Sequence, residues 1–217
     1  MVSVIGIAQN QGSGSGGSIF LTTSALTGGG TIRANGGAGN AGAGGGGRVA
    51  LVLTGPGQDF SGFTGPIVAY GGDYTDPKTD GAAGTVYKQT LADGAGAGTV
   101  KVDNNNLDAA TGTLTRTSLP PTASSTEILK STQWTVQNKG FLNLRASTQI
   151  KSLTIANNAW LDLVGKTLTV KTLTITNKTY AAGTYAAAPL GVLVADSVGG
   201  GSVVVLGLDR GTAVYFH

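Results

Sequence analysis

Apolar and polar residues alternate in short runs along the second half of the chain, and this pattern predicts β-strands. Five segments repeat an apolar-polar-apolar triplet: Phe141–Leu144, Leu153–Ile155, Leu161–Leu163, Leu168–Val170 and Leu173–Ile175. Because successive side chains of a strand point to opposite faces, each triplet presents two apolar side chains on one face. The triplets follow one another at intervals of about ten residues or fewer, which is too short for a crossover helix between parallel strands.

The first half alternates apolar strands with glycine-rich connections. Two segments, residues 12–17 and 36–47, are dominated by glycine, which allows positive φ and close backbone approach, so we expect turns or flat loops there. Seven further strands are predicted around these loops: Val2–Ala8, Ser18–Thr23, Thr31–Asn35, Arg48–Leu53, Pro66–Tyr70, Gly84–Gln89 and Thr99–Asp103.

A coil of short strands joined by turns satisfies this spacing, and the predicted fold is an all-β, right-handed parallel β-helix. At about 20–25 residues per turn of the coil, apolar side chains would stack into one continuous interior column. The predicted core residues are Leu142, Leu144, Leu153, Ile155, Leu161, Leu163, Leu168, Val170, Leu173 and Ile175. An antiparallel β-sandwich is the alternative, since its strands are also short and separated by turns.

Proline and charge divide the predicted body into two parts. Pro120 and Pro121 interrupt the strand pattern, so we expect a glycine-rich part at 1–115, an interruption at 116–125 and a regular part with the C-terminal rungs at 126–217. Seven Asp face five Lys and Arg in residues 1–110, whereas four acidic residues face nine basic ones in residues 111–217. The two parts therefore carry opposite net charges.

Composition narrows the functional classes. Glycine accounts for 37 of 217 residues, but hydrophobic residues still make up 40% and charged residues only 12%, which indicates a folded β-protein rather than a linker. Without cysteine there are no disulfides or thiolate sites. Basic residues are scattered singly, so no nucleic-acid partner is expected, and no apolar run predicts membrane insertion. The first residues lack a signal-peptide pattern, which suggests a mature piece or a fragment.

Several motifs are similar to those of known surface proteins. The sequences GGSI at 16–19, GGGGRV at 44–49 and GAAGTVY at 81–87 resemble glycine-rich repeats of large bacterial surface proteins with parallel β-helices. The C-terminal motifs LTVKTLTI, AAGTY, PLG and GGGSVVVL look like the end of proteins that carry autotransporter-associated β-strand repeats. The resemblance implies a secreted or cell-surface, adhesin-like structural role, although the membrane barrel of an autotransporter is missing from the pattern.

The sequence offers little for catalysis, and we expect no enzyme activity. Glu127 is the only glutamate, and the aspartates lie in separate turns, whereas polysaccharide cleavage, the alternative function on such a fold, needs paired carboxylates on one face. The best cation candidate is a loop with Asp73, Asp76 and Asp80, whose oxygens suit Ca²⁺. A solvated loop is the simpler interpretation, because the spacing does not fit an EF-hand; apart from this Ca²⁺ hypothesis, no cofactor is expected.

Two further sets of residues suggest binding surfaces. Cell-surface glycans could stack on aromatic side chains if these align on one face; the candidates are Trp134, Trp160, Tyr70, Tyr74 and Tyr87. The end strands of the rod are apolar and lack an obvious capping helix, which predicts head-to-tail self-assembly into filaments, or cover by flanking rungs of a longer parent chain. The predicted assembly residues are Val2, Val4, Ile5, Ile7, Val203, Val204 and Val205.

Overall fold

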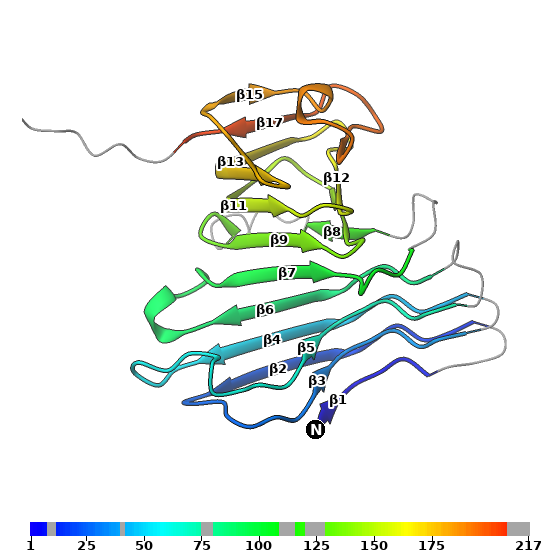
Figure 1. Cartoon of the computed structure of the whole chain (residues 1–217), viewed down its shortest axis with the longest axis vertical. Coiled ribbons are helices and arrows are strands. Elements are labelled where there is room, and N and C mark those ends of the chain that lie inside the picture. Colours follow the sequence, from blue (N-terminus) through cyan, green and yellow to red (C-terminus); the bar gives the residue numbers. More distant parts are fainter. Residues whose placement is uncertain (8–11, 40–41, 75–79, 109–115, 120–128, 208–217) are drawn as a thin grey trace, which may run out of the picture.

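The protein is all-β, and its sheets are rich in parallel strand pairs. The computed structural model describes residues 1–217 except 8–11, 40–41, 75–79, 109–115, 120–128 and 208–217 (Figure 1). Helical structure in the described part is limited to the short 3₁₀ segments η1 (Leu91–Asp93) and η3 (Ala188–Leu190) and to the single residue Leu129. No helix among the described residues has the length and apolar character needed to cross a membrane.

One long sheet runs from end to end of the molecule (Figure 1). Its strands, in spatial order, are β15 (Gly183–Tyr185), β17 (Ser202–Val205), β13 (Thr167–Ile175), β11 (Thr148–Ile155), β9 (Gln133–Gln137), β7 (Thr99–Asp103), β6 (Thr85–Gln89), β4 (Arg48–Leu53) and β2 (Ser18–Thr23), with β14 (Lys178–Tyr180) paired to β13.

Two smaller sheets complete the fold, and the chain passes back and forth between them and the long sheet. The first contains β1 (Val2–Ser3), β3 (Ile32–Arg33) and β5 (Ile67–Val68). The second contains β16 (Val194–Ala195), β12 (Trp160–Asp162), β10 (Phe141–Leu144) and β8 (Thr117–Leu119). Each small sheet is parallel throughout. The predominance of parallel ladders is not the pairing of an antiparallel sandwich, the alternative expected from the sequence.

Register keeps apolar residues stacked on apolar residues. In the second half, Leu153 of β11 pairs with Trp134 of β9 on one side and with Leu173 of β13 on the other. A one-residue slip would turn each of these side chains to the opposite face, so burial of one face fixes the register. All ten residues predicted to form the core are buried, which confirms that part of the sequence analysis.

The buried face of the long sheet changes between β6 and β7, which run antiparallel. In this pair Val86 lies opposite Lys101, and Tyr87 lies opposite Val100, so each couple shares a face. Val86 is buried with the first half, whereas Val100 is buried on the other face with the second half. Each small sheet therefore covers a different face of the same long sheet.

The two halves consequently have separate hydrophobic cores. The first core lies between the strands β2, β4 and β6 and the sheet β1-β3-β5; it contains Ile19, Ile32, Ala34, Val49, Leu51, Ile67, Ala69 and Val86. The second lies between β7, β9, β11, β13 and β17 and the sheet β16-β12-β10-β8. The change of core falls within residues 90–98. Of the interruption expected at 116–125, Thr117–Leu119 form strand β8, and residues 120–125 lie outside the described residues.

Glycine-rich segments extend the first half into a layer, called here the glycine layer, in which main chains hydrogen-bond directly to one another. Gly72 donates its amide to the carbonyl of Gly44 at 2.8 Å, and the Gly81 amide donates to the Gly72 carbonyl at 3.0 Å. A Cβ atom on Gly81 would lie 1.9 Å from the Gly44 carbonyl oxygen, closer than any side chain permits. Glycine is thus needed here because neighbouring main chains touch, as the sequence suggested.

A buried asparagine connects the two halves. Asn104 is fully buried; its side-chain oxygen accepts the amide of Gly71 at 3.0 Å, and its nitrogen donates to the carbonyls of Gly81 and Leu107. Gly71 and Gly81 belong to the glycine layer, whereas Asn104 follows β7 at the start of the second half. The side chain is fully hydrogen-bonded, so it adds a satisfied polar bridge across the junction.

Two glycine-to-alanine variants test the close backbone contact in the glycine layer. Gly81→Ala should lower the free energy of unfolding by about 3 kcal/mol, because the new methyl group collides with the Gly44 backbone. Gly12→Ala is the matched control: no atom lies within 4 Å of its Cβ position, so the change should stay within about 0.5 kcal/mol. Equal denaturant midpoints for the two variants would contradict the close contact of the glycine backbones.

Candidate functional site: a groove where the two cores meet

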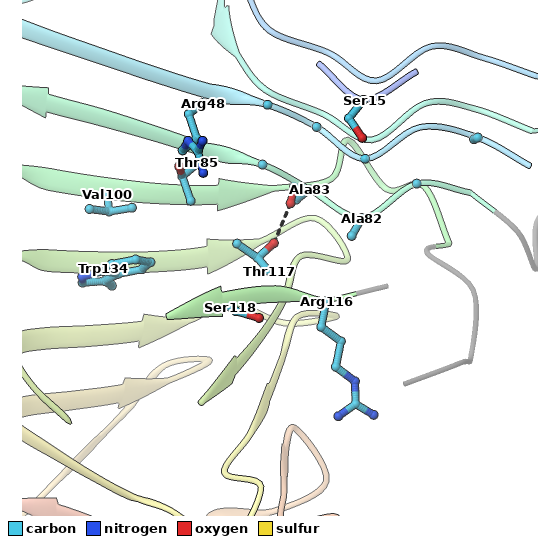
Figure 2. A pocket seen from close by; sticks show the side chains of 16 residues that line it. Ser15, Arg48, Ala82, Ala83, Thr85, Val100, Arg116, Thr117, Ser118 and Trp134 are labelled. Atoms are coloured by element: carbon cyan, nitrogen blue, oxygen red, sulfur yellow. Dashed lines mark hydrogen bonds between the residues drawn. The ribbon is translucent and has the colours of Figure 1, made fainter. Parts of the chain in front are cut away.

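The change of buried face opens a groove of about 650 Å³ beside the junction (Figure 2). Arg48 and Thr85 line it from β4 and β6, Val100 and Trp134 from β7 and β9, and Thr117 and Ser118 from β8. Arg48 and Thr85 are register neighbours, and so are Val100 and Trp134. On this face of the long sheet, β4 and β6 are open to solvent, whereas β7 and β9 are covered by the second core. The groove lies at the boundary between the two.

The groove combines hydroxyl groups with one unpaired cation. The Thr117 hydroxyl donates to the Ala83 carbonyl at 2.6 Å, and the Ser118 hydroxyl accepts the Arg145 Nε–H at 3.0 Å. Ser15 lies at the glycine-rich edge of the groove. Within the described part of the chain, the exposed Arg48 forms neither a side-chain hydrogen bond nor an ion pair. Arg48 is thus available to an anionic ligand.

The second arginine of the groove is used by the fold. Arg116 forms an ion pair with the buried Asp162, and its guanidinium lies 4.3 Å from the centre of the Phe141 ring. Burial raises the pKa of Asp162, but hydrogen bonds from Ser197 and Val164 and the charge of Arg116 outweigh it and leave the pKa below its ordinary value. Figure 2 shows the Arg116 side chain extending away from the labelled hydroxyl groups.

The carboxylates of Asp103 and Asp196 accept hydrogen bonds from neighbouring backbone and side-chain donors. Asp103 accepts hydrogen bonds from the Asn105 amide, Gln137 and Asn138. Asp196 accepts the amides of Gly165 and Gly201, which lowers its pKa. In the described ranges, no three acidic, histidine or cysteine side chains gather as a metal site would require. These carboxylates therefore stabilise turns instead of facing the groove.

The predicted calcium loop is only partly described. Asp76 lies outside the described residues, and the side chain of Asp73 is exposed. Asp80 is 3% exposed and accepts the Tyr74 amide at 2.7 Å, and its burial raises the pKa of the carboxyl. One oxygen of Asp80 is therefore engaged by the loop's own backbone, and the Ca²⁺ hypothesis gains no support from the described residues.

The aromatic residues do not form the expected sugar-stacking strip. Trp134 is 4% exposed and donates its ring N–H to the Thr132 hydroxyl at 2.8 Å, so its inclusion in an exposed strip was wrong. Its register with Val100 and Leu153 places the ring in the core column. Trp160 belongs to a small sheet, 6.2 Å from the Phe141 ring.

The tyrosines of the expected strip are half-buried and separated along the chain. Tyr87 packs against the second core and donates its hydroxyl to Gln89 at 2.5 Å. Tyr70 and Tyr74 lie in the glycine-rich part of the first half, where the Tyr70 amide donates to the Asn35 side chain. Burial raises the pKa of both Tyr70 and Tyr87.

The predicted assembly residues divide into a buried and an exposed group. Val203 and Val205 are buried, and β17 is paired with β13 on one edge and β15 on the other, so their assignment to an interface was wrong. Val204 is half-buried in the same strand. At the opposite end the apolar side chains are open to solvent, with exposed fractions of 50%, 40%, 50% and 69% for Val2, Val4, Ile5 and Ile7.

Comparisons with protein-family profiles, with curated proteins and with solved structures give no match. The site is therefore interpreted from its own geometry. Sequence reasoning did not single out Arg48. Arg48 opens a predicted strand without any motif around it, and its place beside the groove depends on which face the second half covers.

The lowered pKa of Asp162 predicts an acid-dependent stability. Because the folded pKa lies below the unfolded value of about 3.9, the ionised carboxyl stabilises the fold above that pH, and this contribution is lost as pH falls through the folded pKa. Asp162→Asn should cost about 3 kcal/mol at pH 7, since it leaves Arg116 without its counter-charge.

Melting temperatures measured from pH 7 to pH 2 test this expectation. The difference between wild type and Asp162→Asn should shrink as the wild-type carboxyl is protonated. Asp73→Asn, at an exposed position, should follow the wild-type profile. A difference that stays constant down to pH 2 would show that the ionised Asp162 does not stabilise the fold.

Proposed function

We propose that this chain is an extracellular structural or adhesive module, wound as a right-handed parallel β-helix, whose N-terminal end binds a second copy of itself. The alternation of the chain between the long sheet and a small sheet, with parallel registers between successive passes, supports the coil. Partners on β11 and β13 lie twenty residues apart, as in Ser152 and Thr172, within the range of solenoid repeats. The resemblance of the glycine-rich motifs to surface proteins supports the location.

The antiparallel step between β6 and β7 is compatible with one hand of winding throughout. It reverses the strand direction, and the buried face of the sheet changes at the same place. Rotating one half by 180° about the axis along which the strands of the long sheet stack makes both changes together. Such a rotation leaves the hand of the coil unchanged. The two halves therefore fit a pair of coils of the same hand, joined back to back, and neither half needs the rare left-handed connection.

The difference between the two ends of the molecule is the observation that carries the proposal. At the C-terminal end, β15 covers the edge of β17 (Figure 1). The Tyr180 and Tyr185 rings pack edge to face there, with their centres 5.5 Å apart, beside the core. At the N-terminal end, β1 and β2 are the last strands of their sheets, as β15 and β16 are at the opposite end, but among the described residues no antiparallel strand folds back over β1 or β2. A strand at a sheet edge presents unpaired N–H and C=O groups, which are a template for another strand.

The N-terminal end also lacks charged side chains and prolines, which are two of the devices that protect sheet edges. Residues 1–32 contain no charged residue and no proline; Arg33 is the first charge in the chain. Phe20 on β2 is 75% exposed, and Ile5 and Ile7 extend the apolar surface of this end. Charged side chains and proline on edge strands discourage pairing, so their absence favours association here.

A second copy fits this end in a head-to-head arrangement. Two identical edges related by a two-fold axis meet in antiparallel orientation, and neither β1 nor β2 carries a charged side chain of its own; Arg33 lies on the neighbouring strand β3, where its Nε–H donates to the Ser3 hydroxyl at 2.9 Å. A head-to-tail filament through β17 would require β15 to leave its edge. The proposed assembly is thus a closed dimer in place of the filament expected from the sequence.

Molecular mass measured by light scattering over a dilution series tests the proposed assembly. Wild type should approach twice the monomer mass as concentration rises, whereas Ile5→Lys and Phe20→Lys should remain monomeric, because each places a charge on the contact. Val192→Lys is the matched control: Val192 is 91% exposed at the capped end, so this variant should still dimerise. A wild type that stays monomeric at every concentration, or dimerises equally well with Ile5→Lys, would overturn the proposal.

Glycan binding is a second candidate function, and the groove favours it. The exposed Arg48, the surrounding hydroxyl groups and the absence of any acidic residue among the groove-lining residues suit a polar ligand with negative charge. A binding function of this kind is compatible with an adhesive module. Nothing in the described groove arranges carboxylates for cleavage of a polysaccharide.

A further inference from the structure

We propose that the groove between the two cores binds a carboxylated saccharide of about two or three rings, with Arg48 as the residue that holds the carboxylate. The inference rests on the second candidate function, glycan binding, and adds its site and ligand class. A volume of about 650 Å³ lies within the range of small-molecule sites. The open sides of the groove leave space for a longer chain to continue beyond it.

Charge selects the ligand. The groove is lined by two arginines and no acidic residue, and the ion pair with Asp162 neutralises the charge of Arg116. This leaves the positive charge of Arg48 uncompensated in the described part of the site. A guanidinium presents parallel N–H groups that match the two oxygens of a carboxylate, which makes arginine well suited to a sugar acid.

The remaining lining fits the rings of a sugar. Thr85, next to Arg48 in register, and Ser15 and Ser118 place hydroxyl groups around the groove, where they can exchange hydrogen bonds with sugar hydroxyls. Ala82 and Val100 contribute apolar surface between these polar groups. Sugar rings present the same mixture of hydroxyl edges and C–H faces.

Other anionic ligands fit less well. A nucleotide would need further cations for its phosphates and an exposed aromatic face for its base, but Arg116 is already paired and the Trp134 ring is buried. The rigid surroundings also favour a ligand that binds without rearrangement: Arg48 lies on β4, Thr85 on β6 and Ser118 on β8, all in paired strands.

Calorimetric titration of the full chain with trigalacturonic acid tests the proposal. Wild type should bind saturably, and the fully methyl-esterified trimer, which lacks the charge, should bind at least about tenfold more weakly. Sialyllactose, titrated in parallel, distinguishes a sialic acid from a uronic acid as the source of the carboxylate. Binding of either acidic sugar with loss of affinity for its ester supports the inference.

Four variants locate the binding to the groove. Arg48→Gln should weaken the interaction about tenfold or more, and Arg48→Lys should retain only part of the affinity, because a lysine cannot make the paired contact. Thr85→Phe should abolish binding by filling the groove. Lys151→Gln, which removes an exposed positive charge from β11, is the matched control and should bind as wild type does. Circular dichroism spectra should be the same for all four.

The outcomes separate this inference from the proposed module. Absence of saturable binding to both acidic sugars at millimolar concentration, or equal affinity of wild type and Arg48→Gln, would overturn the groove assignment. Dimerisation through the N-terminal end would be unaffected by that result. A loss of dimerisation with intact, Arg48-dependent sugar binding would instead overturn the assembly and leave the groove assignment in place.

Discussion

The antiparallel contact between β6 and β7 is the constraint on which the rest of the molecule depends. Cross-strand partners share a face, so once Val86 is committed to the first core, its partner Lys101 must lie on the same face and Val100 on the opposite one. The second half can then bury its apolar column only by covering that opposite face. The groove beside Arg48 follows from the same step, because the second core begins where the first half leaves this face uncovered.

Both halves have a hydrophobic core, but only the first half adds a layer of glycine backbone to it. The second half packs large aliphatic side chains, such as Leu142 and Leu161, into a column with essentially no exposure. The glycine layer of the first half replaces side-chain packing with main-chain hydrogen bonds, as between Gly44 and Gly72. Asn104 supplies the buried polar bridge between the two, and its hydrogen bonds fix the glycine segments against the turn that follows β7.

The sequence predicts single strands well and their relation to one another poorly. Ser18–Thr23, Arg48–Leu53 and Thr99–Asp103 have the predicted bounds, because alternation within a strand identifies its buried face. Alternation does not say whether two neighbouring strands bury the same face, so the groove and the role of Arg48 could not be predicted. Trp134 was misplaced since an aromatic residue in a strand looks the same whether it lines a core or a surface.

Labelling of single-cysteine variants with a maleimide tests the change of buried face most directly. Because the sequence contains no cysteine, each variant carries a single reactive thiol. We expect Val86→Cys and Val102→Cys to be protected until the protein unfolds, because both side chains are buried, and Lys101→Cys to react quickly, although residue 101 lies directly opposite residue 86. Protection at position 101 together with rapid labelling at position 102 would contradict the account, because it would place both cores on one face of the sheet.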